Sequence, residues 1–132
     1  MTFDLSQYEL NDTATLTVQD ATGDHDLMVD GKPVKINLFG SGSEEYAKAE
    51  HRANNAQTLR LQASFRGKTV KNASELSANE LAEKLAACTQ SIENFPIDAL
   101  SLYKNNRLGY IRKQVIKFLD DDANFTKPST AN

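Results

Sequence analysis

The sequence predicts an α+β fold with a small N-terminal antiparallel β-meander followed by three main α-helices. Apolar and polar residues alternate between residues 14 and 38, which is the pattern of half-buried strands. From residue 44 onward, apolar residues instead recur every three or four positions, as on one face of a helix. The clearest such face lies near the C-terminus and comprises Leu108, Ile111, Val115, Phe118 and Leu119. This face must be covered, either by the core of the domain or by another protein.

The predicted meander has three short strands. The first covers residues 14–18, where apolar residues alternate with threonines. A polar turn around Gly23 leads to a second strand at residues 27–29. A tight turn at residues 30–33 (DGKP) then leads to the third strand at residues 34–38. So small a sheet needs helices against its apolar face to be stable.

The first predicted helix covers residues 44–65. Ser41 and Glu44 have the spacing of a capping box, Ser43 is a competing N-cap, and Gly67 suits the C-cap. One face of this helix is dominated by alanine and comprises Tyr46, Ala49, Ala53, Ala56, Leu59 and Ala63. Alanines permit the close approach of another helix or of the sheet but bury little area, so we expect this helix to depend on its surroundings.

The second predicted helix begins near Ser77, which has capping-box spacing with Glu80. Its apolar face comprises Leu81, Leu85, Cys88 and Ile92. Pro96 ends any helix that precedes it, and residues 97–103 are expected to form one or two helical turns. The amphipathic C-terminal helix follows.

The composition restricts the class of protein. A chain of 132 residues fits one domain, assigned to residues 1–125, with a disordered polar tail at residues 126–132. No apolar run reaches the roughly 20 residues of a membrane helix, and the N-terminus lacks the features of a signal peptide. The net charge of −3, with both signs interspersed, gives no basic field for nucleic acid. Cys88 is the only cysteine, which excludes an internal disulfide and suits a reducing cytoplasm.

Three short patterns are candidates for chemistry. Asp24-His25-Asp26 could bind a metal or supply a base, but no second ligand cluster accompanies it, so a polar turn is the simpler interpretation. Cys88 lies on an apolar helix face, where a small buried side chain is expected. The run at residues 120–122 is all aspartate, but consecutive helical residues point in different directions. We predict that the protein is not an enzyme and has no catalytic, cofactor-binding or metal-binding residues.

Two stretches together resemble a known family. Residues 34–54 read VKINLFGSGSEEYAKAEHRAN, and residues 85–125 contain LAACTQSIENF and LGYIRKQVIKFLDDDANF. Their order and spacing resemble those of the tail assembly chaperones of long-tailed, siphovirus-like bacteriophages. The matching positions are Gly40, Tyr46, Cys88, Phe95, Ile111, Gln114, Val115, Phe118, Asn124 and Phe125. The spacer at residues 96–106 departs from the family, because it is shorter than in relatives.

The resemblance implies a role in tail morphogenesis. A protein of this family coats the helical tape-measure protein, helps to recruit tail tube subunits, and leaves before the virion is complete. It would therefore act in the cytoplasm of the bacterial host and be absent from the mature virion. It implies neither a nucleic acid nor a membrane as partner, and it leaves homo-oligomerisation open. The alternative is a structural protein of the virion: a minor tail, head-completion or decoration protein.

Binding to a helical partner requires an apolar groove. The apolar stripes of the three predicted helices could form such a groove, with aromatic residues at its edge. The candidate partner-binding residues are Phe95, Tyr103, Tyr110, Phe118 and Phe125.

Overall fold

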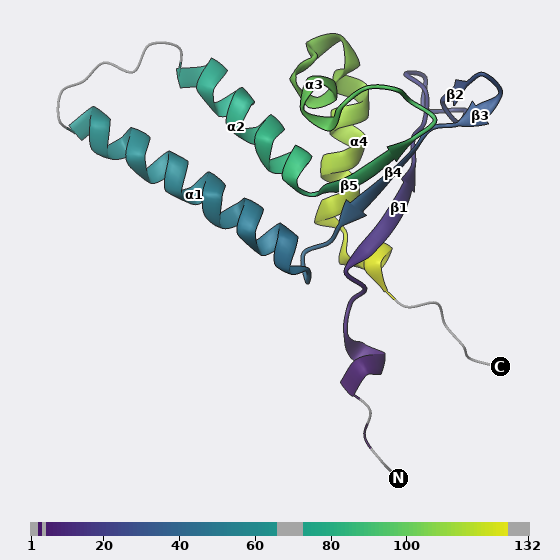
Figure 1. Cartoon of the computed structure of the whole chain (residues 1–132), viewed down its shortest axis with the longest axis horizontal. Coiled ribbons are helices and arrows are strands. Elements are labelled where there is room, and N and C mark those ends of the chain that lie inside the picture. The colour runs from purple at the N-terminus through teal and green to yellow at the C-terminus, as the bar shows by residue number, and fades with distance from the viewer. Residues whose placement is uncertain (1–2, 4, 66–72, 127–132) are drawn as a thin grey trace.

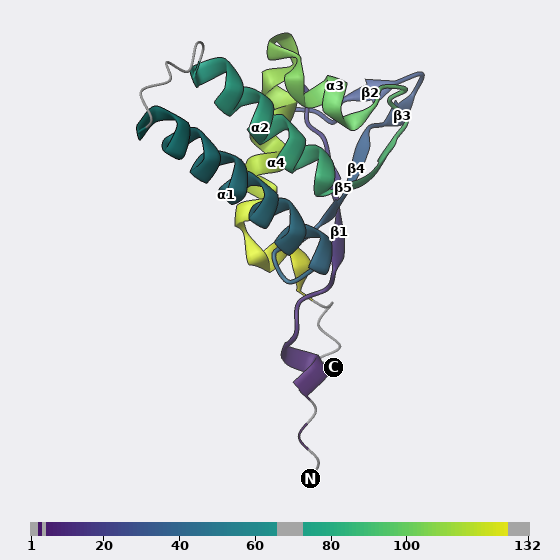
Figure 2. The ribbon, with the colours of Figure 1, turned by 60° about the vertical axis from the view of Figure 1, so that its left-hand side comes forward.

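The α+β prediction is confirmed by the fold of the chain (Figure 1). The structure is a computed structural model that describes residues 3, 5–65 and 73–126. A three-stranded antiparallel sheet lies against a layer of helices, and all four α-helices lie on the same side of the sheet (Figure 2). The predicted C-terminal tail lies outside the described residues, apart from Thr126.

The sheet consists of β1 (Thr13–Thr17), β4 (Lys35–Phe39) and β5 (Thr89–Glu93), in the order β1-β4-β5. Ile36 and Leu38 of the central strand are fully buried on the face that meets the helices. On the other face, Asn37 accepts a hydrogen bond from Thr15 at 2.5 Å and donates one to Ser91 at 2.8 Å. The alternation along β4 therefore places Ile36 and Leu38 on the inner face and Lys35, Asn37 and Phe39 on the outer one.

The predicted meander is only partly correct. The second strand, β2 (Met28–Val29), pairs with β3 (Lys32–Pro33) in a separate two-stranded ribbon. Asp30 and Gly31 turn this ribbon with positive φ angles of 52° and 75°. A meander would leave one edge of β4 unpaired. In the structure, β5 pairs with that edge, although it comes from much later in the chain.

The helices are α1 (Glu44–Phe65), α2 (Ala73–Ala87), α3 (Ala99–Lys104) and α4 (Gly109–Asp120). In the part of the chain that the structure describes, short 3₁₀ segments accompany them: η1 (Leu5–Tyr8), η2 (Asn106–Leu108) and η3 (Asp122–Phe125). The bounds of α1 agree with the prediction, and its N-cap is Ser43, whose hydroxyl accepts a hydrogen bond from the backbone N–H of Tyr46 at 3.1 Å. α1 packs chiefly against α2, and α2 packs in turn against α3, so that α1 lies at the outside of the helical layer (Figure 1).

The second predicted helix was wrong at both ends. α2 begins at Ala73, four residues before the predicted cap at Ser77, and it ends at Ala87 instead of continuing through Ile92. The chain leaves the helix at Cys88 because the open edge of β4 accepts it as a strand: the N–H of Phe39 donates to the carbonyl of Cys88 at 2.7 Å. Ile92 therefore pairs with Ile36 in the sheet instead of extending a helical face.

The core forms where α4 crosses the inner face of the sheet. Ile111, Val115 and Leu119 of α4 are buried in one cluster with Ile36 and Leu38 of β4. The amphipathic helix predicted near the C-terminus thus has its apolar side covered by its own domain. The sequence left open whether the core or another protein covers these residues, and the structure places them in the core.

Candidate partner-binding groove

Two of the five predicted partner-binding residues are not on the surface. Tyr103 and Phe125 are both fully buried, so the prediction that they line the edge of a groove is wrong. The Tyr103 hydroxyl lies 2.7 Å from the Thr89 hydroxyl, which satisfies its polar end inside the core. The Phe125 ring packs edge-on against the Phe118 ring, with centroids 5.4 Å apart.

The other three residues are half-buried and lie apart from one another along the chain. Phe118 touches the Phe125 ring, and Tyr110 packs at the margin of the core. Phe95 lines a shallow hollow of about 370 Å³ between the β2–β3 ribbon and the loop that follows β5. Because Tyr103 and Phe125 are enclosed in the core, the five predicted residues do not together border one groove.

The residues that carry the family resemblance hold the fold together. Five of them are buried: Gly40, Cys88, Ile111, Val115 and Phe125. The side-chain amide of Gln114 pairs with both backbone groups of Gln19: it accepts from the N–H at 2.7 Å and donates to the carbonyl at 2.9 Å. Asn124 donates to the carbonyl of Phe118 at 3.0 Å and so fixes the turn after α4. These motif positions therefore specify the architecture, and a binding surface has to be sought elsewhere.

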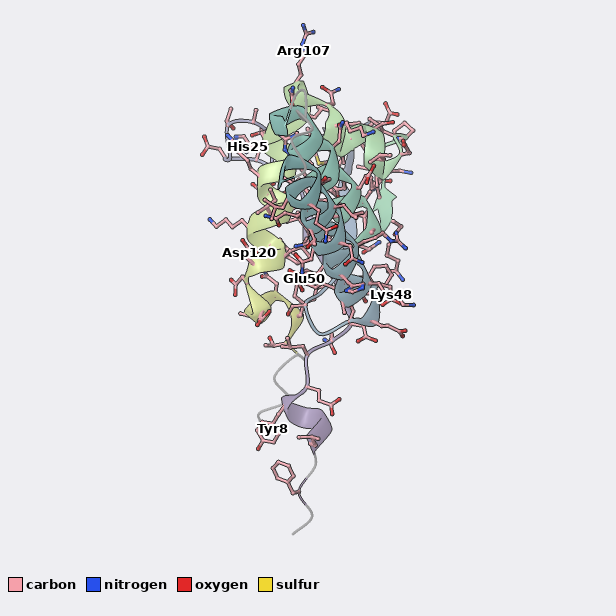
Figure 3. All side chains as sticks on the ribbon, turned by 90° about the vertical axis from the view of Figure 1, so that its left-hand side faces the viewer. Tyr8, His25, Lys48, Glu50, Arg107 and Asp120 are labelled. Atoms are coloured by element: carbon pink, nitrogen blue, oxygen red, sulfur yellow. The ribbon has the colours of Figure 1, made fainter. Side chains whose placement is uncertain are left out.

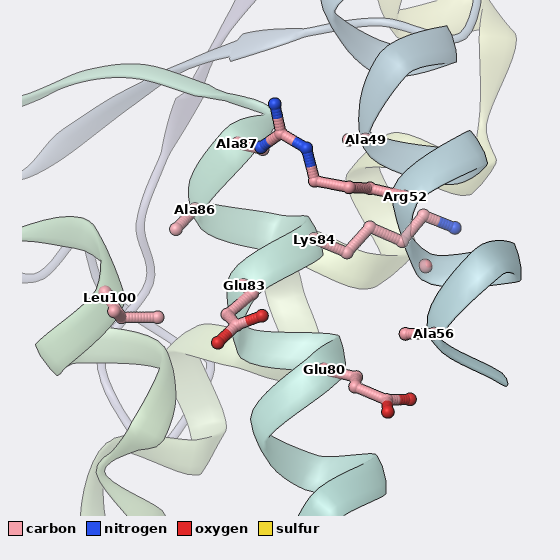
Figure 4. A pocket seen from close by; sticks show the side chains of 10 residues that line it. Ala49, Arg52, Ala56, Glu80, Glu83, Lys84, Ala86, Ala87 and Leu100 are labelled. Carbon is pink, nitrogen blue, oxygen red and sulfur yellow. The ribbon is translucent and has the colours of Figure 1, made fainter. Parts of the chain in front are cut away.

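An apolar hollow lies between α1, α2 and α3 (Figure 4). It has a volume of about 590 Å³, and its apolar lining comprises Ala49, Ala53, Ala56, Ala86, Ala87 and Leu100. Because alanine methyl groups are short, they leave room beside α2 for larger side chains of a bound segment. We call this hollow the alanine groove.

Charged side chains border the alanine groove. Arg52 and Lys84 lie between α1 and α2, whereas Glu83 lies on the side of α3 and Glu80 lies nearer the outer end of α2 (Figure 4). The Lys84 ammonium is held 5.6 Å from the centre of the Tyr46 ring, a cation–π contact that orients it. An apolar floor with a charged rim of both signs fits an amphipathic segment that has an apolar face and polar flanks.

Exposed apolar side chains were the feature that sequence reasoning missed. On α1, Leu59 and Leu61 are 66% and 54% exposed, so Leu59, although it lies on the alanine-dominated face, is not covered by the body. The N-terminal arm, which we define as residues 3 and 5–10, carries Phe3, Leu5 and Tyr8 at 72%, 60% and 71% exposure. Its signal in the sequence was three large apolar residues within six positions of an otherwise polar segment.

The predicted chemical candidates serve as turns and caps. Asp24, His25 and Asp26 are all exposed, and Figure 3 places His25 well away from Asp120. Asp121 caps η3 by accepting from the N–H of Ala123 at 3.0 Å, and Asp122 accepts from the Ser41 hydroxyl at 2.6 Å. Within the described residues, no three His, Cys, Asp or Glu side chains are grouped so that they could hold a metal ion. That the protein is not an enzyme stays a prediction.

Two buried groups have strongly raised pKa values. Burial raises the pKa of the Cys88 thiol from 9.0 to about 11. Burial likewise raises the pKa of Tyr103 from 10.0 to about 12, although its hydrogen bond with Thr89 acts in the opposite direction. Both groups are neutral at physiological pH, so Cys88 is a poor nucleophile in the folded domain.

Comparison of the chain with known protein families, with curated proteins and with solved structures found no match. Among the helices that the structure describes, none has both the length and the apolar character needed to cross a membrane.

Proposed function

We propose that this protein is a bacteriophage tail assembly chaperone that binds helical segments of the tape-measure protein in the alanine groove and helps to recruit tail tube subunits. The observation that carries the proposal is the groove itself, with alanines on both α1 and α2 and a charged rim. The order and spacing of the family-like motifs support the choice of client. The site of action would be the host bacterial cytoplasm, and the protein would be absent from the mature virion.

The groove suits a helix for a physical reason. A helix presents large side chains at positions i, i+3, i+4 and i+7, and these need a floor of small residues if the helix axis is to come close. Ala53 and Ala56 on α1 and Ala86 on α2 supply that floor, because each is half-buried and lines the hollow. A bound helix would complete a helical layer in which α1 now packs chiefly against α2.

Co-expression with the tape-measure protein of the same phage tests the proposal. We expect the tape-measure protein to become soluble and to co-purify with this chain. If the tape-measure protein stays insoluble and does not co-purify, the chaperone assignment is wrong. Mass spectrometry of purified virions tests the alternative, since a virion protein would be present in symmetric copy number and a chaperone absent or sub-stoichiometric.

A groove-filling variant tests the location of binding. Ala56→Phe places a ring in the groove, whereas Ala47→Phe makes the same change at an exposed position of α1 that does not line it. We expect Ala56→Phe to weaken co-purification by at least about tenfold and Ala47→Phe to leave it unchanged. Equal co-purification by both variants would exclude the groove as the client site.

A further inference from the structure

The N-terminal arm extends away from the body of the domain. Figures 1 and 3 show η1, with Tyr8, beyond the end of the sheet and separated from the packed helices. The rings of Phe3 and Tyr8 stack on each other with centroids 5.6 Å apart and planes 10° from parallel. The two rings thus form one compact apolar block that is covered by nothing else in the described chain and remains more than two-thirds exposed.

The base of the arm is firmly attached, in contrast to its tip. The N–H of Asn11 donates to the carbonyl of Phe125 at 2.7 Å, and the N–H of Gly40 donates to the carbonyl of Asp12 at 2.8 Å. These hydrogen bonds hold the chain where the arm begins, and the arm then leads away from α1 and α2 (Figure 1). A projecting apolar segment of this kind is expected to be covered by another molecule.

The alanine groove has the complementary properties. It is a hollow of about 590 Å³ with an apolar floor, and Arg52 and Lys84 lie between α1 and α2 at its rim. In the sequence, the acidic residue Asp4 lies between Phe3 and Leu5, and Glu9 follows Tyr8. An acidic segment with an aromatic block therefore matches a groove with an apolar floor and cations between its two main helices. Glu80 and Glu83 line the remaining parts of the rim, so the arm should lie along the α1 side.

We infer that the N-terminal arm of one copy of this protein binds in the alanine groove of a second copy. The arm and the groove are different surfaces of the same chain, so successive contacts are heterologous and build rings or open filaments. Two copies that exchange arms would instead form a reciprocal two-fold pair. A client helix and the arm would compete for one groove, so that client binding releases the arm. The self-association itself does not depend on the identity of the client.

Cysteine cross-linking tests the contact directly. The native Cys88 is fully buried, so it should not form disulfides with the introduced cysteines. Two singly substituted proteins, Leu5→Cys and Ala56→Cys, are mixed and oxidised, and the heterodimer is quantified by mass spectrometry. The control mixture pairs Leu5→Cys with Ala47→Cys, which lies on α1 outside the groove. We expect at least about tenfold more heterodimer with Ala56→Cys than with the control.

The same chemistry distinguishes exchange between copies from folding back within one copy. A doubly substituted Leu5→Cys, Ala56→Cys chain should form disulfide-linked oligomers whose yield rises with protein concentration. A monomer closed by an internal disulfide, or equal heterodimer yields in the two mixtures above, would overturn the inference.

Solution mass provides an independent measurement. Light scattering coupled to gel filtration should show a mass that increases with concentration for the unmodified protein. Serine at Phe3, Leu5 and Tyr8 should weaken this association by at least about tenfold. Met28→Ser removes a similarly exposed apolar side chain from β2 and should leave it unchanged. A mass that stays monomeric at every concentration, or one that the arm substitutions do not alter, would overturn the inference. These measurements test self-association, whereas co-purification with the tape-measure protein tests the proposed function separately.

Discussion

Gly40→Ala is expected to destabilise the domain because Gly40 lies directly against the Phe125 ring. A Cβ atom at Gly40 would lie 2.5 Å from Cδ1 of Phe125 and 2.7 Å from both Cε1 and Cγ. Favourable contacts between carbon atoms occur at about 3.5–4.0 Å, so the ring has to move by about 1 Å. Phe125 is fully buried and edge-on to Phe118, which leaves it little space to do so.

The sign of the effect separates two physical contributions. Replacing glycine by alanine restricts the unfolded chain and, at an unstrained position, stabilises a protein by about 0.4–1 kcal/mol. Overpacking of a buried ring costs about 1–3 kcal/mol. We therefore expect Gly40→Ala to lower the free energy of unfolding by about 1–2 kcal/mol. For a chain of this size, that corresponds to a fall in Tm of roughly 3–8 °C.

Gly42→Ala is the matched control. A Cβ atom at Gly42 would lie 3.6 Å from its nearest neighbour, the Cβ of Leu10, which is an ordinary contact. Its expected effect is between zero and a gain of about 1 kcal/mol. Urea unfolding followed by circular dichroism gives both values, provided that the m-values agree. If Gly40→Ala proves as stable as the unmodified protein or as Gly42→Ala, the close packing of Phe125 on Gly40 is not what limits this position.

Three further substitutions test the hydrogen bonds of Gln114, the N-cap of α1 and the buried thiol of Cys88. Gln114→Met keeps the length of the side chain but removes both hydrogen bonds to Gln19. It should lower the free energy of unfolding in urea by about 1–3 kcal/mol. A change below about 0.5 kcal/mol would show that these hydrogen bonds are dispensable. Ser43→Ala removes the N-cap of α1 and should cost about 0.5–2 kcal/mol, with a matching loss of helical signal on heating. Because burial raises the pKa of Cys88 to about 11, its neutral form is favoured in the folded state, so the stabilising effect is complete below pH 9 and is lost as the pH rises toward 11. The unmodified protein should therefore lose stability relative to Cys88→Ala over that interval, and parallel pH profiles for the two proteins would contradict the assignment.

The features that the sequence predicted well depend on local patterns. The bounds of α1 and the strand β4 follow from helical spacing and strict alternation, which act between residues close in the chain. The capping pattern offered both Ser41 and Ser43, and only the structure selects Ser43. The burial of Ile111 and Val115 also followed, because a helix with one apolar face has to cover it. No candidate for the alanine groove could be placed from the sequence, although the alanine stripe on α1 was visible in it.

The remaining features depend on which distant segments meet. Leu85, Cys88 and Ile92 keep helical spacing, yet the chain becomes a strand after Cys88 because β4 offers an unpaired edge. An aromatic side chain has the same apolar character wherever it occurs, so the pattern alone could not separate Tyr103 and Phe125, which the body encloses, from Phe3 and Tyr8, which it does not. The sequence by itself determined the fold class and the direction of each apolar face. Only the tertiary structure decided which faces were covered, because burial is a property of two surfaces in contact and the second surface is often far away in the chain.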